Sequence, residues 1–459
     1  MAGAATVDVT RLIDERPMSW FNVRIVLLCF LVVFFDGYDI GAISFAGPAL
    51  VRAWGITNMA ALGSLFSATL FAMVFGGPLF GWIGDRYGRR SAIIAACLVI
   101  GCFSLASMSA HSVPQLLVWR FLTGVGIGGL TSNTLAMNAE FAPRRVRATM
   151  VIIMFTGITI GGGVPGPVAI ALLPTYGWQV LFLIGGVAPL VMAGACALFL
   201  PESLKFLVVR GDRRAEAVAL ARRLAPGLDI GPQTVLTVAD EKAYARFSPR
   251  LLFSDGLGWI TPLLWLLFVC NLMSFYFVNT WLPTILQTAR VSPSEAAFAG
   301  FLFQIGGTVG GLALTRPVDR FGFTPLCFLF VFALPVSCLI GYATVSRSLL
   351  MLDVGLSGFA LLGLQFGLNA ISVLIYPTAF RSAGQAVAGT VGRVGSVFGP
   401  MVAGVLIGMH LPIQALYLTL AVPIGLATAA SLVLARLLAR RARGELGAVP
   451  AAPALRPAE

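Results

Sequence analysis

Residues 84–90 read GDRYGRR at the end of a long apolar run, and residues 318–322 read VDRFG at the end of another. The aspartates of the two copies lie 234 positions apart. Arg147 and Arg381, each of which follows a later apolar run, have the same separation of 234 positions. One offset at two loops predicts two homologous halves that have the same orientation in the fold.

The composition is that of a polytopic membrane protein. The chain has 459 residues, of which 58% are hydrophobic and 11% are charged, and soluble domains of this length are not so apolar. The formal charge of +12 does not indicate nucleic acid binding, because nearly all Lys and Arg residues fall in short loops between apolar runs. The seven cysteines lie within apolar runs, and we interpret them as small hydrophobic residues without disulfides or metal-ligand spacing.

Twelve apolar stretches are long enough to cross about 30 Å of hydrocarbon as helices. Proline or glycine marks most junctions between them, as expected at helix boundaries. The stretches cover residues 25–50, 59–83, 91–110, 115–138, 148–172, 178–200, 258–284, 295–315, 324–344, 349–373, 384–408 and 411–437. Together with the repeat, they predict an all-α membrane fold of two pseudo-symmetric six-helix halves.

The basic residues predict the orientation in the membrane. Of the 31 Lys and Arg residues, 26 fall on the side of the N-terminus, three fall on the opposite side and two lie within spans. This asymmetry predicts that both termini are cytoplasmic.

These boundaries divide the chain into five parts. We expect a cytoplasmic N-terminal segment at 1–24, six-helix halves at 25–200 and 258–437, a cytoplasmic central loop at 201–257 and a disordered cytoplasmic tail at 438–459. The loop segment from Arg213 to Leu224 has a helical pattern with basic residues on one side. We expect a solvated or membrane-surface helix there, not a domain.

Asp36-Gly37-Tyr38-Asp39 lies in the middle of the first span. A charged side chain at the centre of a bilayer costs about 2.5–3.5 kcal/mol on insertion scales, so two carboxylates in one span need a reason. Their spacing puts both on one helix face, where they can serve a proton or ion pathway or hydrogen-bond to neighbouring helices. Gly37 thins the helix between them, so that another helix, a substrate or water can approach the backbone.

The segment from Gly81 to Arg90 resembles the loop signature of the major facilitator superfamily. The resemblance covers residues 20 to 440 and implies a transporter whose two halves rock about a central site. It implies that the cytoplasmic gate consists of Asp85, Arg86, Arg89, Glu140, Arg147, Asp319 and Arg381. Glu140 offers its carboxylate to Arg144, Arg147 or Arg86. The second copy of the motif lacks the arginine pair, so its latch should be weaker.

Within that superfamily, Asp-Gly-Tyr-Asp in span one resembles the aromatic acid:proton symporters, which carry Asp-Gly-x-Asp there. NLMSFYF at 271–277 and GRVG at 392–395 fit the same family. The resemblance implies a secondary transporter of the bacterial inner membrane that imports benzoate-like or hydroxybenzoate-like anions with protons by alternating access. It implies no enzyme activity, no cofactor and no metal. We expect a monomer in the lipid bilayer that binds no nucleic acid.

A benzoate-like substrate needs a cation or amide donors at one end and aromatic walls at the other. Two arginines lie within spans, Arg120 and Arg393, and which of them holds the carboxylate stays open. Arg120 lies at a depth from which its side chain can reach Asp39 if spans one and four face each other. The two histidines fall in short loops, which leaves the carboxylates Asp36 and Asp39 as candidate proton carriers. The candidate substrate residues are Arg393, Arg120, Tyr38, Asn271, Tyr276, Gln365 and Asn369.

Two other transporter classes stay open. GYDIG at 37–41 and PESLKFL at 201–207 resemble the sugar:proton symporters, but the glutamines expected in spans five and seven are absent. GGGVPGP at 161–167 resembles the motif of drug efflux antiporters, although it also simply permits close helix packing. A membrane enzyme or a receptor finds no support, because the sequence has no nucleophile motif, no phosphate loop and no cluster of His, Cys and carboxylates.

Overall fold

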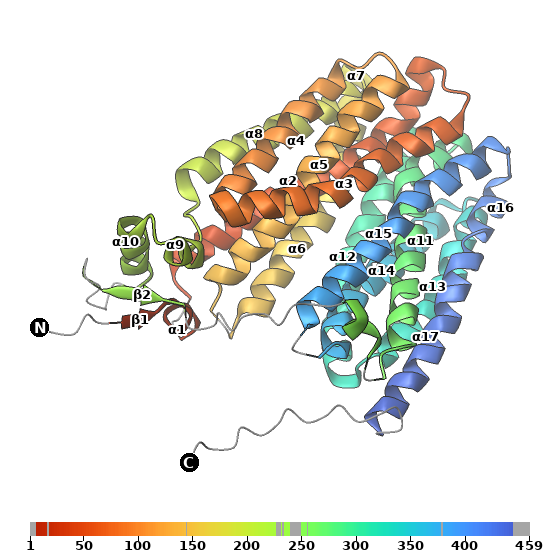
Figure 1. Cartoon of the computed structure of the whole chain (residues 1–459). Coiled ribbons are helices and arrows are strands. Elements are labelled where there is room, and N and C mark those ends of the chain that lie inside the picture. Colours follow the sequence, from red (N-terminus) through yellow and green to blue (C-terminus); the bar gives the residue numbers. More distant parts are fainter. Residues whose placement is uncertain are drawn as a thin grey trace, which may run out of the picture.

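The computed structural model describes residues 6–15, 18–143, 145–225, 231, 234–238, 249–254, 256–377 and 380–443. Within these residues, 12 helices are long and apolar enough to cross a membrane, as the sequence predicts. Figure 1 shows two bundles side by side, one built from α2 to α8 and the other from α11 to α17. The predicted all-α fold with twelve spans is therefore confirmed.

The elements in chain order are β1 (Thr6–Asp8), α1 (Val9–Asp14), α2 (Trp20–Trp54), α3 (Met59–Tyr87), α4 (Arg89–Met108), α5 (Val113–Phe141), α6 (Arg147–Gly163), α7 (Pro165–Tyr176), α8 (Gln179–Phe199), α9 (Leu204–Arg210), α10 (Arg214–Leu224), β2 (Val235–Thr237), the 3₁₀ helix η1 (Pro249–Phe253), α11 (Ile260–Thr288), α12 (Pro293–Phe321), α13 (Thr324–Ala343), α14 (Arg347–Ile375), α15 (Arg381–Gly408), α16 (Ile413–Leu418) and α17 (Ala421–Ala442). Span five consists of α6 and α7, and span twelve consists of α16 and α17.

The first span is longer than its apolar stretch. α2 begins at Trp20 and ends at Trp54, instead of covering only residues 25–50. Ser19 starts the helix with a capping box that involves Asn22, and Gly55 ends it with a φ of 58°. Capping groups satisfy the end amides and carbonyls, so they place the ends of a helix where hydropathy alone does not.

The internal repeat is visible in the helix bounds. α3 and α12 begin at residues 59 and 293 and end at residues 87 and 321, so both ends are 234 positions apart. α5 and α14 have the same separation at both ends, from 113 to 347 and from 141 to 375. The two halves are thus built on one backbone plan.

The close contacts between helices repeat with the same offset. A Cβ placed on Gly76 would lie 2.8 Å from the carbonyl carbon of Val125, which brings α3 against α5. The equivalent contact brings α12 against α14, where a Cβ on Gly310 would lie 2.9 Å from the carbonyl carbon of Phe359. Glycine at these two positions lets the backbones touch, as is usual in membrane helix pairs.

The two bundles meet at the end of the molecule remote from the chain termini, and they diverge toward the termini (Figure 1). We name these the far end and the terminal end. Three hydrogen bonds join described residues of the two halves, between the far end and the middle of the spans. They are Arg52 to Gln287 at 2.8 Å, Ser67 to the carbonyl of Val397 at 2.6 Å, and Thr308 to Thr159 at 2.7 Å.

Aromatic packing strengthens the contact at the far end. The rings of Phe66 in α3 and Trp281 in α11 meet edge to face with their centroids 5.0 Å apart. Gly63 lets α3 approach α15, because a Cβ there would lie 3.3 Å from the Cα of Gly404. The halves are therefore closed against each other at the far end.

The N-terminal segment packs against the central loop at the terminal end. β1 pairs in parallel with β2, from Thr6 opposite Val235 to Asp8 opposite Thr237. Buried residues of α1 belong to the same hydrophobic cluster as buried residues of α9 and α10. We name β1, α1, α9, α10 and β2 the terminal module.

Two sequence expectations need correction here. The helix predicted between Arg213 and Leu224 is present as α10, but it is not simply solvated, because Ala217, Val218, Leu220 and Ala221 are buried. The predicted disordered tail began at residue 438, whereas α17 continues to Ala442. The remainder of that expected tail, residues 444–459, lies outside the described residues.

Gly76→Ala and Gly310→Ala should each lower the thermal unfolding temperature of the detergent-purified protein, because the added methyl group overpacks a backbone contact. Overpacking of this kind costs about 1–3 kcal/mol. Gly194→Ala is the matched control, because nothing lies within 4 Å of its Cβ position and alanine favours helices over glycine. Equal unfolding temperatures for all three variants would show that these glycines do not hold the helix pairs.

Candidate functional site

A fully buried ion pair joins α2 to α5. The guanidinium of Arg120 donates from Nη1 to Asp39 Oδ1 at 3.1 Å and from Nη2 to Asp39 Oδ2 at 2.7 Å, and both side chains have 0% exposure. Arg120 Nη2 also donates to the main-chain carbonyl of Asp39 at 3.1 Å. The sequence estimate that Arg120 can reach Asp39 is therefore confirmed.

Neighbouring groups in the first half complete this ion pair. Ser104 in α4 donates its hydroxyl to Asp39 Oδ1 at 2.8 Å, and the guanidinium carbon of Arg120 lies 5.5 Å from the ring centroid of Phe182 in α8. Tyr38 is buried beside Gly185 of α8, where the Asp39 carboxylate also lies. Because both of its Nη atoms bind the Asp39 carboxylate, Arg120 is engaged within its own half and does not present a free cation.

Asp36 lies on the same side of α2 but has different partners. It is 1% exposed, its Oδ2 accepts a hydrogen bond from Thr131 of α5 at 3.0 Å, and its Oδ1 has no hydrogen-bond partner among the described residues. Asp36 interacts electrostatically with Arg393 of the second half and with Tyr276. An incompletely satisfied carboxylate within a span is a candidate functional position.

Arg393 of α15 is a charged neighbour of this carboxylate. The side chain is half-buried, and its guanidinium forms no hydrogen bond or ion pair with any described residue, while it interacts electrostatically with Tyr276 and Asp36. Close packing of α15 on α11 positions it, since a Cβ on Gly392 would lie 3.0 Å from the Cβ of Phe268. Arg393 is thus a positioned cation at the junction of the two halves.

Amide side chains from the second half lie near the same junction. Asn271 in α11 is 2% exposed and donates to Gln365 Oε1 of α14 at 3.0 Å and to the carbonyl of Leu361 at 3.2 Å. The Oδ1 atom of Asn271 has no hydrogen-bond partner among the described residues. Asn369, the other amide predicted in α14, is exposed.

This amide pair lies within one position of the repeat equivalent of the Asp36 pair. Gln365 follows Thr131 by 234 positions, and Asn271 follows Asp36 by 235. In both halves a polar residue of the first helix therefore bonds to a polar residue of the fourth. One pair can ionise and the other cannot.

Among the described residues, no predicted gate residue forms a hydrogen bond or ion pair with the opposite half. Asp85 is 70% exposed and pairs with Arg89 at 2.7 Å, while Arg89 also donates to Asn133 at 3.3 Å. The guanidinium of Arg86 lies over the rings of Trp82 and Tyr87. Asp319 is exposed without an ion pair to any described residue.

Glu140 has a partner that the sequence did not predict. Glu140 accepts a hydrogen bond from Ser203 of the central loop and forms no ion pair with Arg86 or Arg147. Arg144, also named as its partner, lies outside the described residues. Arg147 instead pairs with Asp14 of α1, which links the terminal module to the start of α6.

Arg147 and Arg381 make equivalent bonds in the two halves. Each donates its Nε to a carbonyl five residues earlier, Arg147 to Ala142 at 3.2 Å and Arg381 to Tyr376 at 3.4 Å. The offset that related these arginines in the sequence therefore relates their contacts as well.

Sequence reasoning missed several participating residues. Thr131, Ser104 and Asp14 are common polar residues whose spacing gives no signal before the helices are packed. Asp353 in α14 did carry a signal, because it is a carboxylate within a predicted span; its Oδ2 is buried and lacks a hydrogen-bond partner among the described residues. No group of three His, Cys, Asp or Glu side chains in the described residues is arranged to hold a metal ion.

A family model described as Major Facilitator Superfamily matches residues 29–366 and 264–457 of the chain. The chain belongs to the major facilitator superfamily. Both the superfamily and the aromatic acid transporter branch predicted from the sequence are confirmed, and the protein is a multi-pass membrane transporter, not an enzyme.

Several curated proteins of this superfamily are similar over nearly the whole chain. The 4-hydroxybenzoate transporter PcaK of Pseudomonas putida is 37% identical, over 93% of this chain and 96% of its own. The gallate transporter of Pseudomonas putida is 34% identical over 91% and 93%. The benzoate transport protein of Acinetobacter baylyi is 30% identical over 91% and 90%.

Solved structures of the superfamily share the fold. The xylose transporter XylE from E. coli, in a partially occluded inward open conformation, superimposes with a TM-score of 0.70 at 17% identity. The alignment covers 91% of this chain and 98% of that one. At this identity the likeness supports the fold alone.

Arg120→Ala should lower the thermal unfolding temperature strongly, because it leaves the Asp39 carboxylate buried without its cation. Breaking a buried pair costs about 3–5 kcal/mol, whereas replacing both partners can be nearly neutral. Asp39→Ala combined with Arg120→Ala should therefore recover part of the loss. Arg393→Ala is the control and should change the unfolding temperature little, because that guanidinium has no ion pair with a described residue. A double variant that is less stable than Arg120→Ala alone would contradict the role given to the pair.

Proposed function

We propose that the chain imports an aromatic carboxylate together with protons, through a site between its two halves that opens in turn to each side of the membrane. The observation that carries the proposal is Arg393, a half-buried guanidinium without a partner among the described residues, opposite the incompletely satisfied carboxylate of Asp36. The relatives named for 4-hydroxybenzoate, gallate and benzoate support the substrate class.

The groups around Arg393 suit a flat anion. A guanidinium can bind a carboxylate with two parallel hydrogen bonds. Tyr276 lies near it, with its ring 4.8 Å from that of Phe275, which in turn stacks on Phe303 at 5.8 Å. Asn271 and Gln365 supply amide groups that can bond to ring hydroxyls. A cation, an aromatic wall and amides are what an aromatic acid requires.

We assign the proton to Asp36 and a supporting role to Asp39. Asp36 Oδ1 has no hydrogen bond to lose among the described residues, and its electrostatic partner Arg393 is the group that would bind substrate. Occupation of Arg393 by a substrate carboxylate would remove the cation that favours ionised Asp36. Asp39 is already neutralised by Arg120, so protonating it would break the buried pair.

The distribution of basic residues supports a location in the bacterial inner membrane with both termini in the cytoplasm. The far end then faces outward. Because the halves are closed there, the site between them is open to the cytoplasm in this conformation. In that state the gate residues Asp85 and Asp319 have no partner in the other half among the described residues. We propose that they latch the halves in the opposite state.

Uptake of radiolabelled compounds by cells that express the chain tests the function directly. We expect accumulation of one or more aromatic acids such as benzoate, 4-hydroxybenzoate or gallate, and its collapse with a protonophore but not with sodium replacement. Hexoses and cationic drugs in the same panel, and cells without the chain, are the controls. Accumulation of a hexose alone, or sodium-dependent uptake that resists the protonophore, would refute the proposal.

Asp36→Asn and Arg393→Lys should fail in different ways. Asp36→Asn keeps the shape but cannot release a proton, so it should abolish accumulation while equilibrium exchange of labelled substrate at equal pH survives. Arg393→Lys should weaken binding about tenfold or more in both assays, because an ammonium cannot form the bidentate contact.

Asp212→Asn is the control for Asp36→Asn and should transport normally. Asp212 is an exposed carboxylate of the central loop that pairs with Arg210. Exchange by Arg393→Lys at wild-type affinity would mean that Arg393 is not the anchor. Proton-driven accumulation by Asp36→Asn would assign the proton to another carboxylate.

A further inference from the structure

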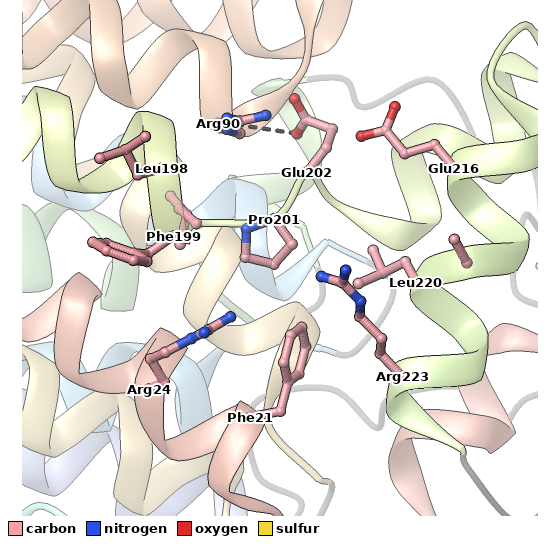
Figure 2. Close-up of a pocket in the computed structure, with 12 residues that line it drawn as sticks. Phe21, Arg24, Arg90, Leu198, Phe199, Pro201, Glu202, Glu216, Leu220 and Arg223 are labelled. Carbon is pink, nitrogen blue, oxygen red and sulfur yellow. Dashed lines mark hydrogen bonds between the residues drawn. The ribbon is translucent and has the colours of Figure 1, made fainter.

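A basic cavity of about 270 Å³ lies at the terminal end, outside the site between the halves. It is lined by the starts of α2 and α4, the end of α8 with the residues that follow it, and α10 of the terminal module, and Figure 2 shows its side chains. Three arginines reach it from three elements: Arg24 of α2, Arg90 of α4 and Arg223 of α10. The transport proposal uses none of these arginines.

Arg24 and Arg223 direct their guanidinium groups toward the space between α2 and α10, beside Phe21 and Pro201 (Figure 2). Neither arginine forms an ion pair with a described residue. The buried Nε atom of Arg24 also has no hydrogen-bond partner among these residues. Two cations therefore converge on one space without an ion-pair partner among the described residues.

The two carboxylates of the cavity do not supply that anion. Glu202 Oε1 accepts from the backbone amides of Arg90 at 3.1 Å and Ser203 at 2.9 Å, so its charge is directed at the start of α4. Burial raises the pKa of Glu202, and hydrogen bonds from backbone amides oppose this rise. Glu216 pairs with Arg213 at 3.9 Å.

The remaining wall of the cavity is apolar and continues onto the membrane-facing surface. Leu198 and Phe199, the last residues of α8, are 78% and 51% exposed. Arg24 directly precedes the apolar stretch of the first span. The cations thus lie at the level where lipid headgroups begin, and the exposed apolar side chains lie where acyl chains would run.

We propose that this cavity binds the phosphate of an anionic phospholipid, with Arg24 and Arg223 on the phosphate and the acyl chains along Leu198 and Phe199. Guanidinium groups form strong charge-assisted bonds with phosphate, and basic pockets between helices at this level bind anionic headgroups. A bound lipid would connect α2 to α10 and hold the terminal module against the first half. A free phosphate ion shares the polar contacts but not the apolar ones.

Native mass spectrometry of the detergent-purified full chain, titrated with phosphatidylglycerol, phosphatidylcholine or inorganic phosphate, tests this assignment. We expect phosphatidylglycerol to bind at least about tenfold more tightly than phosphatidylcholine, and Arg24→Gln and Arg223→Gln each to weaken its binding about tenfold. Arg24→Lys should stay within about threefold of the wild type, because lysine also binds phosphate as a point charge.

Arg316→Gln is the matched control, since Arg316 is an exposed arginine at the terminal end of the second half, and its phosphatidylglycerol binding should be unchanged. Thermal unfolding of each variant without lipid separates lost binding from lost fold. Wild-type affinity for phosphatidylglycerol in both glutamine variants would overturn the site. Displacement of the lipid by an equal concentration of inorganic phosphate would overturn its assignment to a lipid headgroup.

Discussion

The buried ion pair between Asp39 and Arg120 is the interaction on which the central site depends. Moving two charges out of water is costly, and only close geometry with additional hydrogen bonds offsets that cost. Here the two parallel bonds, the Ser104 hydroxyl and the Asp39 carbonyl satisfy most of the polar atoms. Any other rotation of α2 would leave both charges unpaired in hydrocarbon, so the pair fixes the face that α2 turns to α5. Asp36, three residues earlier, is thereby placed against Thr131 and toward α15.

The two halves share a backbone plan and differ in where they place charge. The pair of Asp36 and Thr131 has its counterpart in Asn271 and Gln365, which cannot ionise. Val354 occupies the position that corresponds to Arg120, and Thr159 the position that corresponds to Arg393. The packing is symmetric but the charges are not: the carboxylates Asp36 and Asp39 lie in the first half, and Arg393, which has no ion pair among the described residues, lies in the second.

Features that repeat along the chain could be predicted from the sequence. Hydropathy gave the twelve spans because the bilayer dictates their length, and the offset of 234 gave the halves because helices and loops recur at the same spacing. The contact of Arg120 with Asp39 followed from their depths together with the arrangement of spans one and four that the family resemblance implies. The partners of Glu140 and Arg147 could not be predicted from the sequence, because they depend on how the N-terminal segment and the central loop pack. Neither segment spans the membrane, so bilayer thickness does not restrict its conformation. The parallel pairing of β1 with β2 joins segments more than 200 residues apart. Strands of three residues are too short to show a recognisable pattern in the sequence, so this pairing could not be predicted.

No salt bridge joins the described residues of the two halves at the far end. The hydrogen bonds between the halves join a guanidinium to an amide, a hydroxyl to a carbonyl and a hydroxyl to a hydroxyl, and no two opposite full charges meet there. Opening this contact breaks no ion pair. The free energy of opening is therefore spent mainly on separating apolar contacts such as that of Phe66 with Trp281, and these depend little on ionic strength. The far end can therefore open and close without leaving one member of an ion pair unpaired in hydrocarbon. The charged groups that the movement affects lie instead in the middle of the molecule, at Asp36 and Arg393, and at the terminal end, at Asp85 and Asp319.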